Sequence, residues 1–365
     1  MSVLSVLATI AVLALLIVVH ESGHFLAARL QGIYVNRFSV GFGPVIWKYQ
    51  GAQTEYALRG FPLGGYVGFP DDDPESTIPS NDPNLLRNRP VLDRAIVISA
   101  GVIANLIFAY LVLVLQFGVM GIPDFNYRPG VVVPQIVSPT APAAQAGIKA
   151  GDIILSVDNL TLPASEQARP DLMRAIESHA SQPIQLTVQR DTQTLTFQVT
   201  PSADASGKGR IGVQLAPNGT PFQRRTANPI EVLGESANRF QSIVGQTVQG
   251  YAQLVTNFKQ TVSQVSGPVG IVQQGAKFAQ ADLSNLLVFA VIISINLAVI
   301  NLLPLPALDG GQLAFLLIEG IRGKPIPTKI QDGVMQTGLV LLLGLGILLI
   351  VRDTIQLEWV QKLFQ

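Results

Sequence analysis

Four long stretches of the chain contain no Asp, Glu, Lys, Arg or His, and they dominate its pattern of apolar and polar positions. The stretches are residues 1–19, 95–123, 283–308 and 333–351. A helix rises about 1.5 Å per residue, so each stretch is long enough to cross a hydrocarbon core of roughly 30 Å. We therefore predict a polytopic α-helical membrane protein with about four transmembrane helices. These helices are expected within residues 1–30, 93–122, 283–311 and 333–351.

The first stretch has one alternative interpretation, a cleaved signal peptide. However, residues 1–19 lack a basic start and run into His20-Glu21 rather than a small-residue cleavage site, which favours a retained span. Lys and Arg follow the first and third spans and precede the second, so these flanks are expected on the cytoplasmic side. Residues from about 124 to 280 then lie on the opposite side of the membrane.

The loop between the first two spans, residues 31–92, is expected on the cytoplasmic side and contains a short β element. Weak alternation at Thr54–Leu58, followed by several glycines, predicts a β-hairpin over about residues 54–68. The hairpin is apolar enough to associate with the membrane. Open backbone is tolerated there only where protein or water covers it.

Residues 127–216 have the pattern of a separate domain inserted between the second and third spans. Short alternating runs predict five or more strands, the last at Ile211–Leu215, and Pro170–Ser178 is expected to be a helix. This mixture predicts an α+β, β-barrel-like domain. Residues 217–280 are polar with scattered apolar positions, which predicts one or two amphipathic linker helices.

Composition agrees with a membrane protein and narrows its chemistry. Of the 365 residues, 48% are hydrophobic and 13% are charged, against about 25% charged in a soluble domain. The formal net charge is zero, so we expect no nucleic-acid partner. The chain contains no cysteine, which excludes disulfide bonds and thiolate metal ligands.

The string His20-Glu21-Ser22-Gly23-His24 ends the first apolar stretch and carries the strongest chemical signal. Residues four apart lie on the same face of a helix, so both imidazoles face one point. Two neutral imidazoles at this spacing are typical zinc ligands, and the Glu between them can act as general base toward a water. The alternative is a pair of histidines satisfied by water or lipid headgroups. Ionisable residues at the end of an apolar span are costly, however, and indicate function.

A zinc site with two histidines needs a third protein ligand. His179, the one remaining histidine in the sequence, lies in the predicted inserted domain and is interpreted as a surface residue. Asp309 is the better candidate, because Pro304 and Pro306 stop a regular helix just before it. Unwinding there would let the carboxylate reach the histidine pair. The alternative for Asp309 is an N-cap of the following helix.

Two amides lie in or at the end of the third span, at Asn296 and Asn301. Either could hydrogen-bond a substrate backbone or stabilise an oxyanion. Hydrogen bonding between neighbouring helices is the alternative role for both.

Four motifs in this order resemble the site-2 protease family of intramembrane zinc metalloproteases, in particular its PDZ-containing bacterial and plastid branch. They are HESGH at 20–24, PLGGYV at 62–67, GPVGI at 267–271 and NLLPLPALDGG at 301–311. Together they extend over almost the whole chain, which makes the resemblance more specific than the zinc motif alone. It implies that His20, His24 and Asp309 hold Zn²⁺ and that Glu21 is the catalytic base.

The resemblance also implies how substrate is bound. The hairpin, with Gly64, Gly65 and Tyr66, would receive an unwound substrate as an added strand, since strand addition satisfies exposed backbone groups. The segment 127–216 would be a PDZ domain that binds a peptide or C-terminal ligand. Gly147–Ile154 resembles the turn and strand of that fold.

The family's biology supplies the remaining expectations. Its members carry out regulated intramembrane proteolysis of single-span membrane proteins, such as anti-sigma factors, or of remnant signal peptides. The protein is therefore expected to be a multi-pass protein of a bacterial plasma (inner) membrane or a plastid membrane, in contact with the lipid bilayer. Its PDZ domain would lie on the extracytoplasmic side.

Two other functions fit part of the pattern. A catalytically inactive membrane adaptor could use the PDZ-like module alone, but an inactive relative would be expected to lose at least one of the His, Glu, His and Asp residues. A transporter of zinc or another ion could use the same ligands. The other spans, however, offer no chain of polar residues that would form a pathway.

Overall fold

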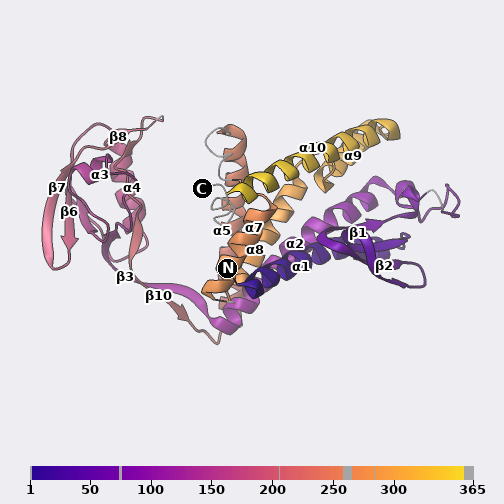
Figure 1. The fold of residues 1–365 in the computed structure, drawn as a ribbon, viewed down its shortest axis with the longest axis horizontal. Helices are drawn as coiled ribbons and strands as arrows, with labels where there is room; N and C mark the ends of the chain where they lie inside the picture. The colour runs from indigo at the N-terminus through magenta and orange to yellow at the C-terminus, as the bar shows by residue number, and fades with distance from the viewer. Residues whose placement is uncertain (1, 74–75, 205, 258–264, 283, 357–365) are drawn as a thin grey trace. The chain divides into compact units, whose positions relative to one another are not determined.

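The computed structural model describes residues 2–73, 76–204, 206–257, 265–282 and 284–356 (Figure 1). Contacts divide the chain into two compact units. We call Met1–Val119 with Ala227–Gln365 the membrane unit, and Met120–Thr226 the inserted unit.

Among the described residues of the membrane unit, four helices are long and apolar enough to cross a membrane. They are α1 (Val3–Leu30), α2 (Val91–Met120), α8 (Asn285–Leu302) and α10 (Thr328–Ile355). The number of candidate spans predicted from the sequence is thereby confirmed. The third span is shorter than predicted: α8 ends at Leu302, because Pro304 and Pro306 cannot continue a helix. Residue 283, where that span was expected to begin, lies outside the described residues.

The membrane unit contains further helices among its described residues. They are α5 (Pro229–Thr256), α7 (Pro268–Ala281), α9 (Asp309–Arg322) and the single-turn helices Pro70–Asp72 and Leu86–Asn88. The hydroxyl of Tyr110 on α2 donates to the carbonyl of Leu233 on α5 at 3.2 Å, and its ring packs edge-on against Phe240. α5 therefore contacts the apolar helix α2 at Tyr110.

A small sheet follows α1 in the chain and packs beside it (Figure 1). Its strands are β1 (Arg37–Gln50) and β2 (Glu55–Gly68), and each contributes two separate segments to the sheet. Gly41 and Gly43 have φ of +86° and +85°, a conformation that favours glycine and lets β1 change direction. In order across the sheet, the paired segments are 45–50, 55–59, 37–40 and 65–68. The segment 65–68 therefore lies at one edge.

The predicted hairpin over residues 54–68 has the wrong pairing. Its two halves do not pair with each other, because segment 37–40 lies between them and pairs with both. Phe38 on this central segment contacts the ring of Phe25 on α1 at 5.4 Å and that of Tyr56 on β2 at 6.2 Å. Aromatic packing against the zinc-motif helix thus holds the central segment in place.

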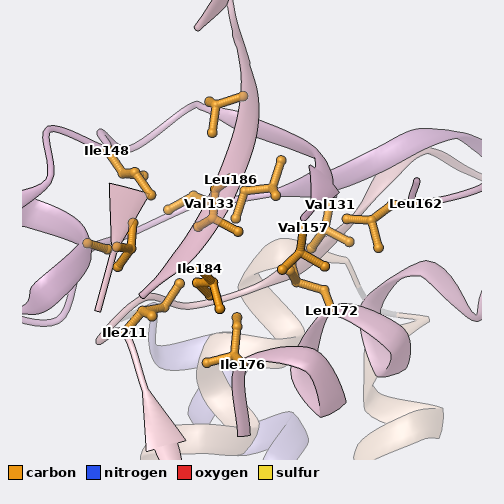
Figure 2. Packing of buried hydrophobic residues seen from close by; sticks show 14 of the residues in the cluster. Val131, Val133, Ile148, Val157, Leu162, Leu172, Ile176, Ile184, Leu186 and Ile211 are labelled. Atoms are coloured by element: carbon orange, nitrogen blue, oxygen red, sulfur yellow. The ribbon is translucent and has the colours of Figure 1, made fainter. Parts of the chain in front are cut away.

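The inserted unit contains an antiparallel sheet with short helices. The sheet runs in the order β10 (Ala216–Arg224), β3 (Ile122–Val132), β4 (Ile153–Val157), β6 (Ile184–Arg190) and β7 (Gln193–Val199), with β5 (Leu160–Thr161) paired to β4. The other elements are α3 (Pro142–Gln145), α4 (Ala168–Ser178), β8 (Ser202–Ala203) and β9 (Gly209–Arg210). Figure 2 shows the core, where Leu172 and Ile176 of α4 pack with buried residues of the sheet such as Val131 and Leu186.

The inserted unit is larger than the predicted 127–216. Strands β3 and β10 pair over most of their length, from Ile122 with Arg224 to Val132 with Ala216. Both strands therefore extend beyond the predicted bounds, and pairing between them defines where the unit begins and ends.

Two further predictions at the end of this unit are wrong. Residues Ile211–Leu215 do not form a strand; Val213 makes a single bridge to Ile136, and the last strand of the sheet comes after them. The linker helices, expected over 217–280, therefore begin at Pro229. Closure of the sheet into a barrel-like form stays a prediction, since β10 and β7 lie at opposite ends of the described sheet.

A buried ion pair ties the turn before β4 to the end of β6. Asp152 is 1% exposed and accepts from Nε and Nη2 of Arg190, each at 2.8 Å, and from the backbone N–H of Lys149. Burial disfavours the charge of this carboxylate. The guanidinium and the backbone donor outweigh burial and hold the pKa of Asp152 below its ordinary value.

We expect Arg190→Leu to destabilise the inserted unit by leaving a buried carboxylate unpaired. Because the pKa of Asp152 is lower in the folded than in the unfolded state, the pair stabilises the fold above an aspartate pKa of about 3.9. That contribution is lost as pH falls through the folded pKa. Hydrogen exchange of β4 and β6 amides in the full-length protein, corrected for intrinsic rates, measures the effect.

The matched control is Arg174→Leu, which breaks an exposed pair with Asp171 and should change protection little. Equal protection of β4 and β6 in the wild type and in Arg190→Leu at neutral pH would contradict the stabilising role of the Asp152–Arg190 pair.

Candidate metal centre

His20 and His24 lie one turn apart on the same face of α1. Their Nε2 atoms are 3.2 Å from each other, and the two rings pack edge to face at 4.8 Å. Both side chains are largely buried, with 13% and 12% exposed. The predicted convergence of the two imidazoles is therefore present in the structure.

Asp309 comes from the other end of the membrane unit's sequence and reaches the same point. It is the first residue of α9, after a turn in which Ala307 has a φ of +68°. The N-cap of α9 is Leu308, so the alternative role of Asp309 as N-cap is wrong. Its Oδ2 lies 3.3 Å from Nε2 of His20 and 3.4 Å from Nε2 of His24.

The three donor atoms have the spacing that a tetrahedral zinc ion requires. Zinc binds nitrogen and carboxylate oxygen at about 2.0–2.1 Å, and two ligands of a tetrahedron then lie about 3.3 Å apart. The separations of 3.2, 3.3 and 3.4 Å between the donor atoms match one face of such a tetrahedron. His20, His24 and Asp309 therefore fit a zinc ion in size and in ligand type.

Hydrogen bonding around His24 gives a second reason for a cation at this point. Its Nδ1 lies 2.9 Å from the carbonyl oxygen of Val97, which only accepts, so Nδ1 carries the proton. Nε2 of the neutral ring then presents a lone pair toward Oδ2 of Asp309. That oxygen is buried and has no hydrogen-bond partner among the described residues. Facing lone pairs in a buried site repel each other, and a bound cation removes the repulsion.

Helix α2 contributes residues to this site that sequence patterns did not single out. Gly101 lies against the histidines, where an added Cβ would be 2.3 Å from Nε2 of His24. Nδ2 of Asn105 lies 3.3 Å from Nδ1 of His20. An amide within an apolar span is a detectable signal for Asn105. A small residue such as Gly101 leaves no comparable signal.

A cavity of about 560 Å³ opens beside the three ligand candidates. Glu21, which is 9% exposed, lies in its wall between the histidines. Gly65 at the edge of the small sheet approaches this side chain so closely that an added Cβ would lie 2.9 Å from Cγ of Glu21. The predicted catalytic carboxylate and the sheet edge therefore share one cavity.

Most of the other predicted residues also line this cavity. They are Gly64, Gly65, Tyr66 and Asn301. Asn296 is not part of its lining: its amide donates to the carbonyl of Ile292 at 2.8 Å and accepts from the hydroxyl of Tyr251 on α5. His179 belongs to the inserted unit, where Nδ1 lies 2.7 Å from the carbonyl oxygen of Ala175 at the end of α4.

Comparison with known proteins agrees with this site. The family model described as Peptidase family M50 matches residues 8–345. The chain belongs to peptidase family M50, the site-2 protease family. It is thus a metalloprotease of a membrane protease family, as its four sequence motifs predicted.

Relatives of this site-2 protease match it from end to end. The protein named "Putative zinc metalloprotease all3971" of Nostoc sp. is 61% identical and is covered over 100% of its length by 99% of this chain. "Membrane metalloprotease ARASP, chloroplastic" of Arabidopsis thaliana is 45% identical, over 98% of this chain and 80% of its own length. Among solved structures, the PDZ domain of an SdrC-like protein from Listeria innocua is 22% identical over 24% of this chain and 92% of its own, with a TM-score of 0.21.

Proposed function

We propose that this site-2 protease is an intramembrane zinc endopeptidase that cleaves transmembrane segments of single-span membrane proteins. The convergence of His20, His24 and Asp309 at the ends of apolar elements carries the proposal. Glu21 lies in the same cavity and is available for proton transfer. Ionisable groups at bilayer depth are costly, so their assembly around one cavity supports a catalytic role.

In the proposed mechanism, His20, His24 and Asp309 would hold the zinc ion. When bound, the ion supplies a Lewis acid that polarises the scissile carbonyl and makes a water more acidic. Glu21 accepts a proton from the attacking water and then passes it to the leaving amine, so one carboxylate acts first as base and then as acid. Because Glu21 is almost fully buried, bulk water does not compete for this proton.

The edge of the small sheet is proposed to bind the substrate as an extended strand. The residues proposed to line its path are Gly64, Gly65, Tyr66 and Asn301. Peptide bonds in a helix are shielded by their own hydrogen bonds, and addition to a strand edge satisfies them after unwinding. The close approach of Gly65 to Glu21 supports this path. Asn296 is left out because its amide is bonded to Tyr251 and to its own helix.

The inserted unit is proposed to be a PDZ domain on the extracytoplasmic side that binds a peptide or C-terminal segment. Gly147 and Gly151 have positive φ of +96° and +93° in the turn that resembles that fold, which supports the assignment. The Nostoc and chloroplastic relatives support a bacterial plasma membrane or a plastid membrane. Regulated proteolysis of anti-sigma factors or removal of remnant signal peptides is the proposed role.

Removal of the metal should abolish cleavage. We expect purified full-length protein in liposomes to cut a model single-span substrate, to lose this activity in phenanthroline, and to regain it when zinc is added back. The measurement is the rate of product formation on a gel, with fragment masses to locate the cut.

The same preparation separates the alternative functions. A transporter would accumulate metal inside the liposomes without cleaving the substrate, and an adaptor would bind the substrate and leave it intact. Cleavage that continues in excess chelator would contradict the metal-dependent mechanism.

A further inference from the structure

One face of α2 is directed at the two histidines. Val97, Gly101 and Asn105 are spaced four residues apart, so they lie on the same side of the helix on successive turns. Val97 offers its carbonyl to Nδ1 of His24, and Gly101 has no side chain between the helices. The third position, Asn105, faces Nδ1 of His20. Each imidazole therefore has its own partner on α2.

Asn105 is fully buried, and one end of its amide has no partner. Nδ2 lies 3.3 Å from Nδ1 of His20, while Oδ1 has no hydrogen-bond partner among the described residues. The oxygen and nitrogen ends of an amide are nearly identical in shape, and hydrogen bonding decides which way the group faces. Asn105 can therefore present either a donor or an acceptor to His20.

The two amide orientations correspond to two forms of His20. With Nδ2 facing the ring, Nδ1 is an acceptor and Nε2 carries the proton, so Nε2 has no lone pair for a metal. With Oδ1 facing the ring, Nδ1–H donates to the amide and Nε2 has a free lone pair. Only the second form can ligate a metal through Nε2.

The backbone of Asn105 is fixed at this depth by a second helix. Its carbonyl accepts a hydrogen bond of 2.8 Å from the hydroxyl of Ser294 on α8, and both residues are 0% exposed. The chain of α8 continues through the turn to Asp309. One buried position thus contacts α1, which carries both histidines, and α8, which leads through the turn to Asp309.

We propose that Asn105 is a positioning residue that orients His20 and holds it in the tautomer that ligates zinc. This inference rests on the proposed zinc site. A metal-bound histidine normally donates its other ring N–H to a carbonyl or carboxylate oxygen, and loss of such a partner lowers metal affinity by about 10- to 100-fold. Val97 fills this role for His24, and Asn105 fills it for His20.

The test compares two replacements of nearly the same shape. Asn105→Leu has no hydrogen-bonding group, and Asn105→Asp has oxygens only. We expect Asn105→Leu to weaken zinc binding by about 10- to 100-fold, and Asn105→Asp to retain wild-type affinity or exceed it. Zinc affinity is measured by competition with a chromogenic chelator in purified full-length protein, and Co²⁺ absorption reports any change in ligand geometry.

The control Asn296→Leu makes the same chemical change in another span, at a position outside the cavity lining, and should leave zinc affinity unchanged. Wild-type affinity in Asn105→Leu, or equal loss in Asn105→Leu and Asn105→Asp, would overturn the inference while the zinc site itself stands. Failure of the proposed function appears differently: the wild type would then bind no stoichiometric zinc, and His20→Ala would change nothing.

Discussion

Glu21→Gln is expected to bind zinc like the wild type and to lose cleavage by about 10²–10⁴-fold. Gln keeps the shape of the side chain but cannot accept a proton from water, and general acid–base catalysis is typically worth that factor. The proposed metal ligands are untouched, because they are His20, His24 and Asp309. Zinc content by mass spectrometry and the rate of cleavage of a single-span substrate measure the two effects separately.

The control Glu235→Gln makes the same change on α5, at a position outside the cavity lining. It should cleave at the wild-type rate. Substantial turnover by Glu21→Gln would show that another group accepts the proton, and loss of zinc from this variant would show that Glu21 contributes to the metal site instead.

The local part of the metal centre could be predicted from the sequence because a helix fixes it. Once residues 3–30 form a helix, His20 and His24 must face one point, whatever the rest of the chain does. Asp309 could be predicted from a shortage of ligands and from two prolines that end the third span. In both cases a short segment of sequence, together with the coordination chemistry of zinc, is enough to predict the ligand.

The sheet beside α1 could not be predicted in the same way. The segments 55–59 and 65–68 have a recognisable strand pattern, but both pair with 37–40, and 55–59 also pairs with 45–50. The choice of these partners depends on contacts with residues outside the segment 54–68. Packing of Phe38 against Phe25 on α1 favours this arrangement over the predicted pairing of 55–59 with 65–68. Alternation of apolar and polar residues predicts that a segment is a strand, but it does not predict which strand pairs with it.

The contribution of α2 was hidden for a different reason. Val97 acts through its backbone, so its side chain carries no information about the hydrogen bond to His24. Gly101 acts by the absence of a side chain. Of these three residues, Asn105 alone has a polar side chain. Its role could not be predicted, because it depends on which helix packs against α2 at this position.

Gly101→Ala is expected to abolish zinc binding and cleavage, although Ala is the better helix former by about 1 kcal/mol. The added methyl would lie 2.3 Å from Nε2 of His24 and 2.8 Å from Cε1 of His20, closer than carbon atoms approach other groups. Either the two imidazole rings rotate, so that their Nε2 atoms no longer converge, or α2 moves away from α1 and the hydrogen bond between His24 and the carbonyl of Val97 is lost. A displacement of about 1 Å is enough to lower activity about 100-fold.

Movement of α2 away from α1 would break close packing between the two helices. A Cβ at Gly23 of α1 would lie 2.3 Å from the carbonyl oxygen of Ala100, so the two backbones are in contact at this level. Such close approach through small residues is how helices associate in a membrane. The ring positions are therefore the softer part of the site, and loss of metal is the expected result.

The matched control is Gly118→Ala on the same helix, where the nearest atom to an added Cβ would be Cγ1 of Val232 at 4.0 Å. It makes the same gain in helix propensity without a clash, so zinc content and cleavage should stay at wild-type values. Zinc stoichiometry, cleavage rate and thermal unfolding of the three proteins distinguish a local effect from global destabilisation. Wild-type zinc binding by Gly101→Ala would mean that α2 lies further from the histidines than it does in the structure. The hydrogen bonds between α2 and both imidazole rings would then be excluded as well.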